Sequence, residues 1–166
     1  MSAIEIKVDN AGLVLYWPFL SRFFEKLEMA KEGEFVDNES RNRAAYLLQY
    51  LAHSQTDFPE YHFALNKLLV GMNLDDHLSP SFNLTEVEYE VSESLMYGLR
   101  NNWEKVKNST PEGIQKTFIQ REGILNFIEE KIELRVEKKG VDVLVESIPW
   151  NISIIKLPWM PYPMIV

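Results

Sequence analysis

Residues 123–137, GILNFIEEKIELRVE, contain the change of pattern that decides the fold. Over residues 132–137 apolar and charged side chains alternate, which is the period of a strand with one buried face. An apolar run at residues 124–128 precedes this alternation, and the charged residues 129–131 separate the two. The stretch therefore predicts a β-hairpin.

Upstream of this hairpin, apolar residues recur at helical spacing and several segments begin with helix start signals. Thr85 and Glu88 form a Thr-x-x-Glu capping box, and Thr110 followed by Pro111 places an N-cap before a first-turn proline. Alternation over residues 4–8 predicts a short strand, either an edge strand or a linker. The segments expected to be helical are residues 18–33, 38–53, 59–71, 85–103 and 110–123.

The segment after Gly140 fits a strand and one face of a helix equally well. We expect a short helix, because residues 152–157 already supply a third strand and a helix provides the connection that a parallel pairing needs. The prediction is an α+β fold in a single domain, residues 1–166. About five helices form the N-terminal two-thirds, and a small sheet of a hairpin plus a third strand follows. The predicted core residues are Leu20, Phe23, Leu47, Leu48, Leu51, Leu65, Leu68, Leu69, Leu95, Phe118 and Trp150.

The composition excludes several classes of partner. A chain of 166 residues with 46% hydrophobic residues can bury a globular core, and its net charge of −8 opposes binding to nucleic-acid phosphates. No apolar run approaches the roughly 20 residues of a membrane span, and the N-terminus lacks the pattern of a signal peptide. We therefore expect neither nucleic acid nor membrane as a partner. The chain has no cysteine, which excludes disulfides and fits a reducing cytoplasm.

The three histidines and the carboxylates near them are a candidate site for chemistry. Imidazole with carboxylate can bind zinc or act as acid and base, which would make the chain a small metal-dependent or acid–base enzyme. The residues of this alternative are His53, His62, His77, Asp57, Glu60, Asp75 and Asp76. The histidines fall in no His-x-x-x-His or His-Glu-x-x-His frame, and the chain has no nucleophile elbow or phosphate-binding glycine loop. We therefore predict a protein that is not an enzyme, with no catalytic residue, metal ligand or cofactor.

Three polar residues near apolar helices have structural interpretations. Asn66 is expected to make a buried hydrogen bond that fixes a neighbouring loop, and Lys67 to lay its stem on apolar surface with its ammonium in water. Arg121 is expected to form an ion pair or to cap a helix end.

Residues 147–166 form an apolar tail that holds half of the chain's four tryptophans and half of its eight prolines. Such a tail either covers its own core or meets another protein. We expect residues 152–157 to join the domain's own sheet. From Trp159 onward, prolines prevent ordinary strand pairing, and we expect this part to reach a neighbouring subunit or a hub protein. The residues predicted to bind the partner are Trp159, Met160, Tyr162, Met164 and Ile165.

A set of sequence blocks follows in order along the chain and carries a family resemblance. The blocks are NAGLVLYWPFL at residues 10–20, RAAYLLQYLA at 43–52, LNKLLVG at 65–71, NSTPEG at 108–113, FIQREG at 118–123, and the apolar tail. Together they resemble the conserved C-terminal domain of the tape-measure proteins of contractile injection systems, the phage-tail-like syringes of bacteria. The resemblance covers nearly the whole chain.

This resemblance implies a structural role. The chain would be the end domain that anchors a length ruler at the inner tube or at the spike, hub and baseplate complex. It would be cytoplasmic during assembly and then lie within the injection particle. Its expected partners are other particle proteins, and a homo-oligomer stays open. The remaining alternative is a generic protein-interaction module outside any particle.

Overall fold

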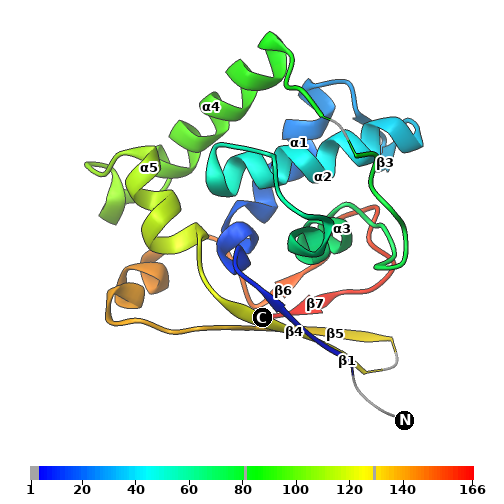
Figure 1. The fold of residues 1–166 in the computed structure, drawn as a ribbon. Helices are drawn as coiled ribbons and strands as arrows, with labels where there is room; N and C mark the ends of the chain where they lie inside the picture. Colours follow the sequence, from blue (N-terminus) through cyan, green and yellow to red (C-terminus); the bar gives the residue numbers. More distant parts are fainter. Residues whose placement is uncertain (1–3, 81, 129) are drawn as a thin grey trace.

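The computed structural model describes residues 4–80, 82–128 and 130–166, and in these the α+β class is confirmed. Helices lie above a sheet whose long β4 and β5 strands form the base of the molecule (Figure 1). The helical elements are η1 Ala11–Tyr16, α1 Trp17–Lys26, α2 Asn38–His53, η2 Glu60–Phe63, α3 Ala64–Leu69, α4 Glu86–Asn101, η3 Glu104–Val106, α5 Pro111–Ile114, η4 Gln115–Ile119 and η5 Gly140–Ser147. The strands are β1 Ile4–Val8, β2 Ala30–Lys31, β3 Glu34–Phe35, β4 Gly123–Ile128, β5 Lys131–Val136, β6 Ile154–Ile155 and β7 Met164–Ile165.

The main sheet has five strands in the order β1-β4-β5-β7-β6. The predicted hairpin is confirmed as the antiparallel pair β4 and β5, and β1 is confirmed as a strand at the edge. The short helix after Gly140 is also confirmed as η5. The predicted third strand is only partly right, because strand geometry is confined to Ile154–Ile155 and these residues do not pair with the hairpin directly. Instead β7 lies between β5 and β6, parallel to β5 and antiparallel to β6.

The predicted helix starts are confirmed where side chains cap them. Thr85 accepts a hydrogen bond from the backbone N–H of Glu88, whose carboxylate accepts one from the N–H of Thr85. Asp37 caps α2 by accepting from the N–H of Ser40 at 2.7 Å. These side chains satisfy amides that have no partner within the helix, so the start of each helix is fixed locally.

Helix ends were predicted less well. The first helix ends at Lys26 rather than Gly33, and Gly33 instead has a φ of 82° between the paired strands β2 and β3. The segment predicted as one helix from residue 59 splits into η2 and α3, and Tyr61, placed on its inner face, is 75% exposed. Gly123 does not end a helix but begins β4. A Cβ at this position would lie 2.8 Å from that of Ala11, so the close approach of the strand to Ala11 requires glycine.

The predicted core is largely confirmed, with two exceptions: Leu95 and Trp150 are only partly buried. The inner face of α4 also differs from the prediction. Val87 is 59% exposed, whereas Glu88 is buried and bonded to Arg43, whose Nε donates to Oε2 at 2.8 Å. Glu88 thus lies on the inner face of α4 in the first turn, where Val87 was expected, whereas Leu99 of the predicted stripe is buried.

The two terminal stretches that carry the resemblance lie against each other. Trp17 donates through its indole nitrogen to the carbonyl of Asn151, and Trp150 donates to the carbonyl of Leu15. The rings of Phe19 and Trp150 meet edge to face at 5.1 Å. The N-terminal helices and the C-terminal tail therefore close the fold on each other.

Candidate functional site

Trp159, the first residue of the predicted partner-binding segment, is docked onto its own chain. Its indole nitrogen donates to the carbonyl of Leu69 at 2.7 Å, and its ring lies 4.7 Å from that of Phe35 and 5.9 Å from that of Phe24. Gly71 permits this approach, because a Cβ there would lie 2.5 Å from the carbonyl oxygen of Trp159. The hydrogen bond and the ring contacts make Trp159 part of the core boundary.

The rest of the tail is also built into the domain. Met160 is 2% exposed and Met164 is fully buried, whereas Tyr162 is 39% exposed and Ile165 is half-buried. The expectation that the prolines exclude this segment from a ladder is wrong. Met164 and Ile165 follow the last proline and pair with β5 and β6, since a proline removes only its own N–H from a ladder.

These positions narrow the predicted partner-binding set. Trp159, Met160 and Met164 contribute to the fold of their own chain, so the picture of a tail projecting away from the domain is corrected. Tyr162 and Ile165 retain exposed surface, and Ile165 lies opposite Ile154, which is 53% exposed. Binding of a partner through these outer side chains stays a prediction.

The histidines divide between two places. His62 Nδ1 lies 3.2 Å from one oxygen of Asp9, and His53 Nε2 lies 3.9 Å from the other. His77 is separate, 3.1 Å from Glu60. Asp9 is not among the predicted carboxylates, and it lies in the two-residue connection between β1 and η1, whose course the sequence does not reveal.

This arrangement offers little chemistry. Within the described residues, no group of three or more histidine, aspartate and glutamate side chains is placed to hold a metal ion. Among the described residues, neither Asp57 nor Asp75 forms an ion pair with a histidine, and Asp76 instead accepts a hydrogen bond from the N–H of Asn73. The predicted set of seven side chains is therefore not brought together.

We expect His53 to make the stability of the fold depend on pH. Burial lowers the pKa of His53 below its ordinary value, with nearby Asp9 opposing this shift and His62 adding to it. The unfolded chain takes up this proton near pH 6.5, before the folded chain does. This contribution to stability is therefore complete above about pH 6.5 and is lost as the pH falls towards the folded pKa.

We expect the His53→Gln substitution to reduce the loss of stability between about pH 7 and pH 5, because it removes a group that is protonated more readily in the unfolded state. The urea midpoint, measured at both pH values, gives the slope of stability against pH. His77→Gln is the matched control, since that side chain is 88% exposed. An unchanged slope in the His53 variant would show that other groups cause the acid sensitivity.

A buried amide cluster joins the N-terminal loop to two helices. Asn10 donates to Gln49 at 3.0 Å and to Asn66 at 2.8 Å, and Asn66 donates to the carbonyl of Ala45 at 2.9 Å. The buried hydrogen bond predicted for Asn66 is confirmed. Lys67 differs from its prediction, because it is 5% exposed and its ammonium lies 3.4 Å from Glu60 rather than in water. These groups fix the packing of α2 and α3 against the N-terminal connection.

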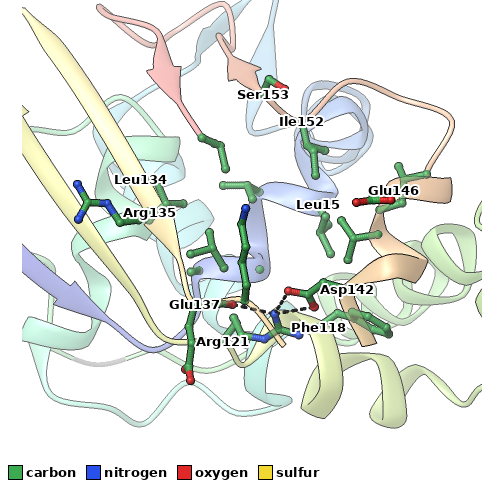
Figure 2. A pocket seen from close by; sticks show the side chains of 18 of the residues that line it. Leu15, Phe118, Arg121, Leu134, Arg135, Glu137, Asp142, Glu146, Ile152 and Ser153 are labelled. Atoms are coloured by element: carbon green, nitrogen blue, oxygen red, sulfur yellow. Dashed lines mark hydrogen bonds and ion pairs between the residues drawn. The ribbon is translucent and has the colours of Figure 1, made fainter. Parts of the chain in front are cut away.

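A groove of about 970 Å³ lies between β5, η1, η5 and the end of the tail. Figure 2 shows Leu15, Leu134 and Ile152 along it and Arg121 at one end. Arg121 donates to both oxygens of Asp142 at 2.8 Å and to the carbonyl of Thr117 at 2.7 Å, so the predicted ion pair and helix-end cap are both confirmed. Arg121 is thus paired within its own chain, and both charged and apolar side chains line the groove.

The amide cluster and the Arg121–Asp142 pair both join elements of the fold. Residues 2–166 match the family model of the contractile injection system tape measure protein, and the chain belongs to this family. A search of curated proteins and one of solved structures found no match. Across the part of the chain that the structure describes, no helix is both long and apolar enough to cross a membrane.

Proposed function

We propose that this chain is a compact end domain that anchors a tape measure protein at the end of the inner tube or at the spike, hub and baseplate complex. The observation that supports it is a family match along residues 2–166 in a chain that folds as packed helices on a sheet. The longest helices, α2 and α4, have 16 residues each and so span only about 24 Å. Such a body is suited to attachment, whereas a ruler requires extended length.

The contact surface in this proposal is the outer side of the β6 and β7 strands with the adjoining turn. Ile154 and Tyr162 are 53% and 39% exposed and carry apolar area that a partner could cover. Ile165 lies opposite Ile154 in the strand pair. The partner would be a particle protein, met during assembly in the cytoplasm and retained in the finished particle.

The test is to produce the particle with a tagged chain carrying Ile154→Asp and Tyr162→Asp together. A buried carboxylate without a partner is costly, so we expect the variant chain to fold but to be lost from purified particles, whose tubes then vary in length. Val36→Asp is the matched control, because Val36 is also 53% exposed but lies beside β3. Normal incorporation of the double variant would exclude this surface, and absence of the unaltered chain from particles would exclude anchoring itself.

A further inference from the structure

The outer edge of β1 is an open strand edge of the main sheet. β1 pairs with β4 on one side and is the first strand in the sheet order, so no strand of the described chain lies on its other side. In Figure 1 it runs along the front of the sheet. Ile4 is 57% exposed. Such an edge presents unpaired backbone N–H and C=O groups to another extended segment.

The alternation of hydrogen bonds along the strands shows which backbone groups of β1 face away from the sheet. Glu137 donates from its N–H to the carbonyl of Glu122 at 2.9 Å across the β4 and β5 pair. Bonding alternates along an antiparallel pair, so the odd-numbered residues of β4 turn their backbone groups towards β1. Because Ile6 lies opposite Leu125, the groups of Glu5 and Lys7 point away from β4.

We propose that β1 pairs antiparallel with β1 of a second copy of this chain around a two-fold axis at Ile6. In this register Glu5 faces the partner's Lys7, Lys7 faces the partner's Glu5, and Ile6 faces the partner's Ile6. The two charge pairs lie on one face of the joined sheet, and the isoleucines meet on the other. Opposite charges and apolar residues directly across from each other stabilise an antiparallel pair, and the contact is self-complementary as a two-fold axis requires.

The charges select this register among those that the backbone allows. Only odd-numbered residues present bonding groups at the outer edge, so the register can change only in steps of two residues. The neighbouring registers place Glu5 opposite the partner's Glu5 or Lys7 opposite the partner's Lys7, and both bring like charges together. A binder without this pattern would lack both complementary pairs, which favours a second copy as the occupant.

Disulfide trapping tests the register, because the chain has no cysteine of its own. Ile6 and the partner's Ile6 form a pair without mutual hydrogen bonds, with Cα atoms about 4.5 Å apart, within the range of a disulfide. Ile4 lies opposite the partner's Val8, which places the two Ile4 positions about 13 Å apart. We expect Ile6→Cys to form a covalent dimer under mild oxidation and Ile4→Cys to remain monomeric. Crosslinking of the Ile4 variant instead would overturn the register.

Charge-reversal variants of the full chain test the dimer, and sedimentation equilibrium measures its dissociation constant. The measurement uses about 0.15 M salt, so that charges more than about 8 Å apart are screened. Glu5→Lys or Lys7→Glu replaces two attractive pairs with two repulsive ones and should weaken dimerisation at least about tenfold. Mixing the two variants restores opposite charges, so we expect a heterodimer. Lys31→Glu makes the same change of charge as Lys7→Glu at an exposed residue of β2, and it should leave the dimer intact.

Three results would overturn the proposal: a monomeric chain at the highest soluble concentration, a dimer indifferent to both charge reversals, or a mixture that stays monomeric. The β1 edge is separate from the β6 and β7 surface, so failure here leaves the proposed anchoring unaffected.

Discussion

Deleting residues 159–166 is expected to leave the chain unable to fold. The deletion removes the buried side chains of Met160 and Met164 and the indole of Trp159 that bonds to Leu69. Truncating one buried methionine costs about 2 to 5 kcal/mol and a tryptophan about 3 to 5 kcal/mol. Together these losses approach the 5 to 15 kcal/mol by which a typical domain is stable, before the lost pairing of β7 is counted.

Circular dichroism and urea unfolding measure the effect of this deletion. Tyr162→Ala is the control within the same segment, because its side chain is 39% exposed and its loss should change stability little. A deletion variant that unfolds cooperatively at the native midpoint would mean that the tail does not belong to the folding unit. The tail could then act purely as a recognition segment.

Gly12→Ala is expected to destabilise the chain by about 3 kcal/mol or more. A Cβ on Gly12 would lie 1.9 Å from the carbonyl oxygen of Phe118 and 2.5 Å from the Cα of Ile119. Both are backbone atoms, so the clash cannot be relieved by rotating a side chain. The substitution must instead push η1 away from η4, and with it the N-terminal segment that contacts the tail.

Gly98→Ala is expected to stabilise the chain, which is the opposite of the effect expected for Gly12→Ala. Gly98 lies within α4, and a Cβ there meets nothing within 4 Å. Alanine in a helix interior is favoured over glycine by about 0.5 to 1 kcal/mol. Urea midpoints should therefore shift downward for the Gly12 variant and upward for the Gly98 variant. Equal shifts would show that the packing around Gly12 is looser than the structure indicates.

Features that depend on a few neighbouring residues could be predicted from the sequence. Asp37, Thr85 and Thr110 cap the helices that follow them, because each side chain reaches an amide three residues ahead. The hairpin formed by β4 and β5 follows from alternation and a short charged turn. In each case the physical cause lies within the segment itself.

Features that depend on distant residues could not be predicted. The residues next to Glu88 in the sequence do not show that Arg43 pairs with its buried carboxylate. The residues next to Gly12 do not show that the backbone of Phe118 lies against it. The same holds for Asp9, which meets histidines from two other elements. For the tail, the prolines correctly predict an interrupted ladder at their own positions. They give no information about the two residues after Pro163, which find partners in β5 and β6.

The interior position of β7 also determines when this domain can form during translation. Its residues, 164 and 165, follow both β5 and β6 along the chain, yet they join these two strands. Until they leave the ribosome, the nascent chain holds helices and an incomplete sheet whose β5 edge is open to other chains. The five-stranded sheet is therefore completed only after residues 164 and 165 have emerged. A translational pause between β6 and β7 would prolong this aggregation-prone stage, whereas a pause within α1 to α5 would occur before β5 exists.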